Sequence, residues 1–178
     1  VKAKKQIMTQ IQMFDISNQL ACSNVLIVGR RGRGKTILSK DIMYNHDKVN
    51  NGKYQTIVLD NFGLDQNMAT LCNTKDTLVI ITTGCLHSFL KTQVFDYVFV
   101  FTEEIAARKM ELFEYFDTIF HTFDQFKRVF KQITTDEYVA MVIDNTIQSN
   151  KIEERVFWYK ADLNNRDRQK EMTTCSIS

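Results

Sequence analysis

A glycine-rich stretch directly after a short apolar run constrains this chain more than any other feature of its sequence. Val25 to Val28 is a compact β-type run, and residues 29–36 follow it with the gapless pattern G-x-x-x-x-G-K-T. Residues 36–45 then read as a helix. A strand, a glycine-rich turn and a helix in this order predict a P-loop, because glycine lets the backbone curl until its N–H groups converge on phosphate oxygens.

The residue types of this motif predict how a nucleotide would be held. Lys35 is expected to reach the β- and γ-phosphates of ATP, and the Thr36 hydroxyl is expected to bind Mg²⁺. The N-terminus of the helix adds a positive dipole end at the same point. ATP and Mg²⁺ are therefore the predicted cofactors. The predicted cofactor-binding residues are Gly29, Arg30, Arg31, Gly32, Arg33, Gly34, Lys35 and Thr36.

The three arginines inside the motif, Arg30, Arg31 and Arg33, leave two interpretations open. Three cations beside a triphosphate would add attraction. Alternatively they point to solvent or to a neighbouring subunit. For at least two of the three we favour this second interpretation.

Alternating β-type and helical segments along the 178 residues predict an α/β fold, with a mainly parallel, RecA-like sheet flanked by helices. Residues 1–161 are expected to form a single P-loop NTPase domain, and the polar residues 162–178 a flexible tail. The expected strands are residues 25–28, 56–59, 77–82, 97–101, 138–143 and 156–159. The expected helices are residues 36–45, 65–73, a long one from an N-cap at Thr102 through Phe123, and 124–133.

Composition narrows the classes of partner. Apolar residues make up 44% and charged residues 25%, as in an ordinary globular protein, and the net charge of +2 means that any nucleic-acid surface must be a local patch. The four cysteines form no CxxC pair, which favours free thiols in a reducing compartment over a zinc site. No apolar run reaches membrane-spanning length, so we expect an intracellular protein without a membrane anchor of its own.

An acid at the end of a second buried strand would hold the Mg²⁺ of a P-loop ATPase. Asp60 follows the strand expected at residues 56–59, but the next residue is Asn61, which cannot accept a proton from water. The short spacing from Thr36 leaves open that the true acidic strand is missing. Asp96 precedes a strand and Asp144 comes late in the chain, so both are weaker candidates.

The second half of the chain resembles the genome-packaging ATPases of nucleocytoplasmic large DNA viruses, the poxvirus-type branch of the FtsK–HerA superfamily. The most specific stretch is residues 143–161, where Asp-Asn-Thr, Ser-Asn-Lys-Ile-Glu and Phe-Trp-Tyr-Lys-Ala occur in order. The matching segments are residues 95–101, Ile105 with Arg108 and Lys109, and residues 113–116, 142–146, 149–154 and 156–161.

This resemblance implies an ATPase that translocates double-stranded DNA into a preformed viral capsid. It also implies a homo-oligomeric ring with ATP between subunits, working in the host cytoplasm at a virus factory or in the virion. By strand order it favours Asp60 as the metal-holding acid, with Asn61 in place of a second acid. Arg108 becomes the candidate for an arginine offered to a neighbouring subunit, with an exposed helical arginine as the alternative.

The implied catalytic residues are thus Lys35, Asp60 and Arg108, and the metal-site residues are Thr36 and Asp60. The basic cluster at residues 127, 128 and 131 could contact DNA phosphates or could be a solvated helix face. A nucleotide-binding assembly subunit without hydrolysis remains an alternative, because Asn61 stands where a second acid is expected and the family's middle region is condensed here into residues 54–76. A small nucleotide kinase or a GTPase is less favoured, since no arginine-rich lid and no properly placed guanine motif is found.

Overall fold

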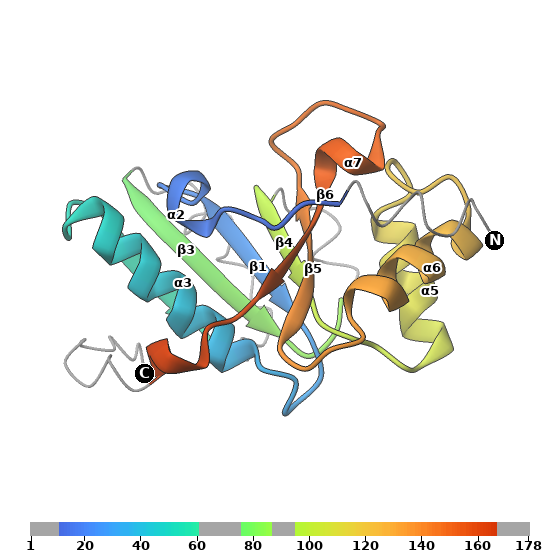
Figure 1. The fold of residues 1–178 in the computed structure, drawn as a ribbon, viewed down its shortest axis with the longest axis horizontal. Coiled ribbons are helices and arrows are strands. Elements are labelled where there is room, and N and C mark those ends of the chain that lie inside the picture. Colours follow the sequence, from blue (N-terminus) through green and yellow to red (C-terminus); the bar gives the residue numbers. More distant parts are fainter. Residues whose placement is uncertain (1–10, 61–75, 87–94, 167–178) are drawn as a thin grey trace.

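The computed structural model describes residues 11–60, 76–86 and 95–166. These residues form an α/β fold in which helices cover both faces of a six-stranded sheet (Figure 1). In chain order the elements are α2 (Ile16–Gln19), β1 (Asn24–Val28), α3 (Lys35–Asn50), β2 (Gln55–Leu59), β3 (Thr77–Thr83), β4 (Tyr97–Val100), α5 (Ala106–Tyr115), α6 (Phe123–Ile133), β5 (Val139–Asp144), α7 (Ile152–Arg155), β6 (Val156–Lys160) and the 3₁₀ helix η2 (Leu163–Arg166).

The strand order in the sheet is β2-β3-β1-β4-β5-β6. The first four of these strands are mutually parallel, whereas β5 runs antiparallel to β4, and β6 antiparallel to β5. The sheet is therefore mixed, and the expected parallel arrangement holds for its first four strands. We call the end at which these four strands finish the carboxyl edge. In parallel sheets this edge commonly carries the ligand site.

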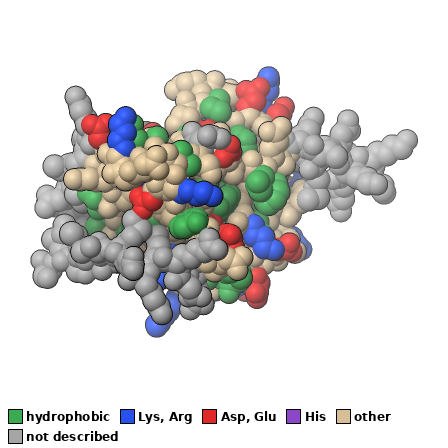
Figure 2. All heavy atoms as spheres, turned by 60° about the vertical axis from the view of Figure 1, so that its left-hand side comes forward, with side chains coloured by type: hydrophobic (Ala, Val, Ile, Leu, Met, Phe, Trp, Pro, Cys, Tyr) green, Lys and Arg blue, Asp and Glu red, His purple; other side chains and the backbone are tan. Residues whose placement is uncertain are grey.

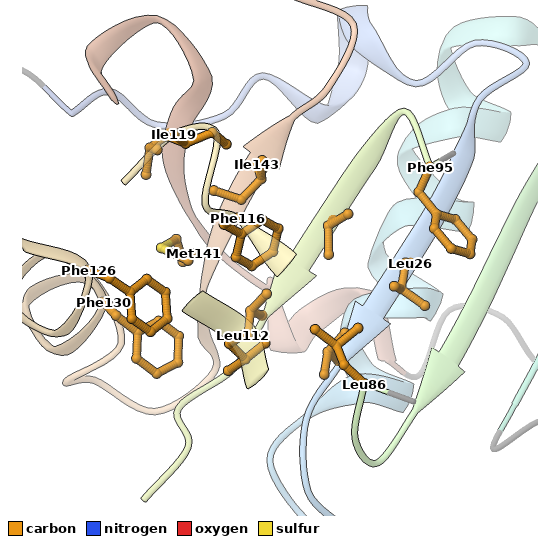
Figure 3. Packing of buried hydrophobic residues seen from close by; sticks show 14 of the residues in the cluster. Leu26, Leu86, Phe95, Leu112, Phe116, Ile119, Phe126, Phe130, Met141 and Ile143 are labelled. Carbon is orange, nitrogen blue, oxygen red and sulfur yellow. The ribbon is translucent and has the colours of Figure 1, made fainter. Parts of the chain in front are cut away.

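Two apolar cores lie on the two faces of the sheet, and alternating residues of β1 contribute to both, as side chains of a strand must. Leu26 and Val28 belong to the core that also contains Leu112 of α5 and Phe126 and Phe130 of α6. Figure 3 shows Leu26 and these helical residues in that core. The other face is covered by α3. Its core members include Val25, Ile27, Leu38 and Ile42. Because β1 is buried on both faces, the segment that follows it has a rigid anchor.

The prediction of one long helix from Thr102 through Phe123 is wrong. Thr102 is not its N-cap: α5 begins after Ile105 and ends at Tyr115, and α6 starts separately after an N-cap at Thr122. The intervening turn is closed by backbone hydrogen bonds from the N–H groups of residues 119 and 120 to the Phe116 carbonyl. Of the apolar residues that suggested one helix, Leu112, Phe116 and Ile119 are buried, Phe123 is partly buried against the same core and Ile105 is 41% exposed. Ile119 reaches the core from the turn and Phe123 from the second helix.

The remaining predictions concern the strands, three shorter helices and the C-terminal residues. The six expected strands are confirmed, as are the helices near residues 36–45 and 124–133, with shifts of a few residues at their ends. The helix expected at residues 65–73 lies outside the described residues. Residues 162–166, assigned from the sequence to a flexible tail, continue the packed structure, since η2 buries Asn165 against α3.

The surface shows no sorting of side chains by type on the face in Figure 2, where acidic, basic and hydrophobic groups are interspersed among the described residues. In the part of the chain that the structure describes, none of the helices combines the length and the apolar character needed to cross a bilayer.

Candidate functional site

Residues 29–36, the glycine-rich loop, join β1 to α3 at the carboxyl edge. The Gly29 N–H donates to the Thr83 carbonyl of β3 at 3.1 Å, which ties the start of the loop to the neighbouring strand. Gly34 is the N-cap of α3 and has a φ of 107°, a conformation that side chains with a Cβ rarely adopt. A Cβ there would also lie 2.8 Å from the Tyr138 ring. Glycine at position 34 is thus required both by conformation and by space.

Lys35 is the best-defined cation of the loop. Its residue is only 7% exposed, and its Nζ donates to the Arg30 carbonyl at 3.3 Å across the loop. Burial lowers the pKa of Lys35, and the nearby Asp60 carboxylate opposes that shift. The loop therefore curls around an ammonium group at the first turn of a helix, where an anion would meet both the lysine and the helix dipole.

Asp60 immediately follows β2, which is separated from β1 by β3. Its exposed carboxylate accepts a 2.5 Å hydrogen bond from the buried Thr82 hydroxyl near the end of β3. Because β2, β3 and β1 are parallel, Asp60 and the glycine-rich loop lie at the same edge, and the carboxylate acts electrostatically on Lys35. The predicted acid is therefore at the lysine's end of the sheet, held by a partner that sequence reasoning did not assign to it.

The residues predicted to bind Mg²⁺ suit that ion chemically. Thr36 and Asp60 are both exposed and offer a hydroxyl and a carboxylate oxygen, the hard ligands that Mg²⁺ prefers. Among residues 11–60, 76–86 and 95–166, no group of three His, Cys, Asp or Glu side chains is placed to hold a metal by itself. A magnesium ion here would draw its remaining ligands from phosphate oxygens and water, as it commonly does.

The arginines of the loop differ in their surroundings, and their role toward a nucleotide stays a prediction. Arg33 forms a 2.7 Å ion pair with Glu104, while Arg30 and Arg31 are exposed at the tip of the glycine-rich loop. Arg108, the candidate for action on a neighbouring subunit, lies on α5 with its side chain 38% exposed and 3.8 Å from Glu103. It is thus half-exposed and loosely paired at the carboxyl edge.

The competing acids lie elsewhere. Asp96 precedes β4 and accepts from the Asn24 N–H at 2.7 Å, at the end of the sheet opposite the glycine-rich loop. Asp144 pairs in register with Tyr97 because β5 is antiparallel, so it also lies at that opposite end. Its Oδ1 accepts from the N–H and hydroxyl of Thr146. Neither acid can serve the loop.

Several residues of the stretch 143–161 have structural partners. Arg155 donates to the Asp144 carbonyl and to the Asn145 side chain, and Asn145 donates to the Phe95 carbonyl. These bonds connect the end of β5 to α7 and to the start of β4. They account for the close spacing of polar residues there without involving the glycine-rich loop.

Asp41, in the middle of α3, is fully buried. Its Oδ2 accepts from the Tyr159 hydroxyl at 2.7 Å and from the Asp162 N–H at 3.0 Å. Its Oδ1 accepts from Asn165 at 2.7 Å and from Asn45 at 3.0 Å. Burial, and then this bond to Asp41, raise the pKa of Tyr159. The carboxylate fixes β6 and η2 onto the helix that follows the glycine-rich loop.

The basic cluster of α6 is mostly engaged locally. Lys127 forms a 2.7 Å pair with Asp124 and lies over the Phe123 ring at 4.6 Å, and Arg128 donates to the Asp124 carbonyl at 3.3 Å. Lys131 is exposed. These contacts favour the interpretation of a solvated helix face for at least the first two cations.

Sequence reasoning missed three features around the loop. The Thr82–Asp60 bond and the Asp41 network join residues far apart in the chain. The sequence signal for them is a polar residue within an apolar segment, which indicates a buried hydrogen-bond partner but does not identify it. Tyr138, with a φ of 62°, packs its ring on Gly34, and nothing in the sequence marks that approach.

Comparison with known proteins finds viral relatives. Over 71 residues the chain is 37% identical to "Uncharacterized protein 088R" of Invertebrate iridescent virus 3, covering 40% of this chain and 27% of that protein. Over 75 residues it is 33% identical to "Uncharacterized protein L437" of Acanthamoeba polyphaga mimivirus, covering 42% of this chain and 25% of that protein. The chain thus spans about a quarter of the length of these relatives. Neither a known family profile nor a solved structure matches it.

Proposed function

We propose that this protein is a RecA-like P-loop ATPase that binds ATP and Mg²⁺ at the glycine-rich loop. The single observation that carries the proposal is Lys35, a buried residue whose ammonium donates across the loop to the Arg30 carbonyl, with Asp60 acting on it from the same edge of the sheet. In this arrangement the loop's N–H groups and Lys35 bind phosphate oxygens, while Thr36 and Asp60 hold the metal. Magnesium would neutralise charge that develops on the transferring phosphate.

We further propose that the ATPase drives the packaging of viral double-stranded DNA into capsids, as a homo-oligomeric ring. Support comes from the sequence resemblance to packaging ATPases and from relatives that are themselves viral proteins. Arg108 would reach the γ-phosphate of a neighbouring subunit's ATP. The Arg108 side chain is half-exposed and lies 3.8 Å from Glu103, so its guanidinium can exchange Glu103 for another anion.

The test is hydrolysis of ATP by the purified protein, with Mg²⁺ and with or without double-stranded DNA. The proposal predicts phosphate release that DNA stimulates and that falls to background in Lys35→Ala. Lys48→Ala is the matched control, because this exposed lysine lies at the far end of the same helix. Absence of phosphate release from the wild-type protein under these conditions would rule out the motor.

A second candidate is an assembly subunit that binds nucleotide without turning it over. The observation that favours it is the chemistry of the acids at the carboxyl edge. Asn61 follows Asp60 in the sequence, and the buried Glu103 already accepts from the N–H groups of Glu104 and Ile105. Such a protein would bind ATP tightly and release no phosphate, so measurable turnover excludes it.

A further inference from the structure

The rings of Phe101 and Tyr138 pack on the backbone of the glycine-rich loop, at the two glycines that begin and end its G-x-x-x-x-G pattern. A Cβ on Gly29 would lie 3.1 Å from Cδ2 of the Phe101 ring. A Cβ on Gly34 would lie 2.8 Å from Cδ1 of the Tyr138 ring. Both rings therefore contact the loop backbone where any other residue would carry a side chain.

The two rings differ in what else surrounds them. Phe101 is 2% exposed and belongs to the apolar core on the α3 face of the sheet, so core packing accounts for its position. Tyr138 belongs to neither apolar core, is half-buried, and lines a groove of about 510 Å³ beside the loop. Burial in a core therefore does not explain why the Tyr138 ring lies on Gly34.

Tyr138 reaches Gly34 from a backbone conformation that a bulky residue rarely adopts. Its φ is 62°, in the left-handed region that glycine, asparagine and aspartate favour. Among the described residues, the other non-glycine residues with a positive φ are Cys22, Asn51 and Asp76. Residues held in sparsely populated conformations cluster at ligand clamps and other functional sites, where the surrounding structure fixes them. The conformation of Tyr138 thus indicates a role beyond packing.

The backbone of Tyr138 is fixed by the segment that follows β6. Its carbonyl accepts a hydrogen bond from the Ala161 N–H at 3.2 Å, directly before β5 begins at Val139. The N–H of the next residue, Asp162, donates to the buried Asp41 carboxylate of α3 at 3.0 Å. The ring is therefore presented to the loop from a segment that is itself hydrogen-bonded to the helix after the loop.

We propose that Tyr138 is a positioning residue, whose ring holds Gly34 in the conformation in which the N–H groups of the loop converge on phosphate. The inference rests on the proposed function, since it needs phosphate as the ligand of the loop. Gly34 is the N-cap of α3, and its φ of 107° sets the direction in which the loop enters the helix. A glycine backbone without such a neighbour samples many conformations, and ordering it on binding costs free energy. A loop that the ring already holds avoids most of that cost.

The experiment measures the affinity for ATP with Mg²⁺ by calorimetry, in the full chain and in three variants of Tyr138. Tyr138→Gly and Tyr138→Asn remove the ring but suit a positive φ, so neither adds backbone strain. Tyr138→Phe keeps the ring and removes only the hydroxyl. Cys22→Gly is the matched control, because Cys22 is an exposed residue with a φ of 54° that precedes β1, at the end of the sheet opposite the loop. Urea denaturation of each variant verifies that binding is measured on folded protein.

We expect ATP affinity to fall about tenfold or more in both ring-free variants, and to stay within about twofold of wild type in Tyr138→Phe and in the control. A merely structural role would lower the denaturation midpoint and leave the affinity of the folded protein unchanged. Unchanged affinity in both ring-free variants would therefore overturn the positioning role alone. An equal loss in Tyr138→Phe would also overturn it, because the hydroxyl would then be a direct ligand. If neither ring-free variant folds, Tyr138 is required for the fold and the positioning role is overturned as well. Wild-type protein that binds no ATP would instead overturn the proposed function, and this inference with it.

Discussion

The middle of α3 and the glycine-rich loop at its start are separated by less than two helical turns, yet their polar groups differ in burial and in the number of hydrogen bonds to protein atoms. In the middle, the Asp41 carboxylate is fully buried and accepts from four donors of the protein. In the loop, the hydrogen bond that Lys35 makes among the described residues is one of 3.3 Å, to a carbonyl of the loop itself, and Thr36 is exposed. At the same edge, Asp60 is exposed as well.

This difference separates residues that hold the fold from residues that are offered to a ligand. A buried group whose partners are all protein atoms is costly to remove, because its partners are left unsatisfied. A charged group with few partners gains little from the folded state, so its removal should cost little stability and much binding. The two regions therefore predict opposite outcomes for stability and for nucleotide chemistry.

Asp41→Ala should produce the largest effect on stability. It leaves the Tyr159 hydroxyl and the Asn165 amide without their acceptor in a buried site, so we expect the free energy of unfolding to fall by about 3 kcal/mol or more. Urea denaturation at neutral pH measures this. Asp117→Ala is the control at an exposed turn and should change stability by less than about 0.5 kcal/mol. Equal stability of the two variants would remove the contrast between the regions.

Asp60→Asn should show the reverse pattern. The amide oxygen can still accept from Thr82, so stability should change by less than about 0.5 kcal/mol. Loss of the negative charge should lower Mg²⁺-dependent turnover about tenfold or more, equivalent to about 1.4 kcal/mol of transition-state stabilisation. Asp76→Asn is matched in exposure and lies at the opposite end of the sheet. Turnover unaffected by Asp60→Asn would remove this carboxylate from the metal site.

His46 is also buried in α3, but unlike the Asp41 carboxylate its Nε2 has no hydrogen-bond partner among the described residues. Burial lowers the pKa of His46 from 6.5. Well above pH 6.5 the His46 imidazole is neutral in both the folded and the unfolded chain. Below it the unfolded chain binds the proton first, so stability should decrease by at most about 1.4 kcal/mol per pH unit. His46→Gln should flatten this acid limb in pH-dependent denaturation. His121→Gln, at an exposed site, should not.

Arg33→Ala should give the smallest effect, although the residue lies inside the glycine-rich loop. Its partner Glu104 is 67% exposed, so the pair is worth about 0.5 kcal/mol or less. If Arg33 does not touch phosphate, ATP affinity should change by less than about threefold. A double-mutant cycle with Glu104→Ala, read by denaturation and by ATP titration, measures both quantities. A much larger loss of affinity would assign Arg33 to the nucleotide instead of to Glu104.

The sequence predicted the loop, its flanking strand and helix, and the six strands of the described sheet, because each of these has a local signature of residue type and period. It could not predict that β5 is antiparallel, because strand direction depends on the path of the connecting chain. It also merged α5 and α6, since Ile119 and Phe123 continue the apolar spacing although the chain turns between them. Pairings such as Thr82 with Asp60, or Tyr159 with Asp41, arise only when distant segments pack together.

The most direct test of the central claim is the binding of ATP with Mg²⁺ to the wild-type protein and to Lys35→Ala, measured by calorimetry alongside unfolding. Wild-type protein should bind ATP, and the variant should lose about 2–3 kcal/mol of binding free energy, roughly a hundredfold in affinity, because a buried cation that faces phosphate is removed. Its free energy of unfolding should not show the loss of about 3 kcal/mol or more that is expected for Asp41→Ala, because burial already disfavours the charged lysine in the folded state. ATP affinity that is absent in the wild-type protein, or equal in both proteins, would contradict the account.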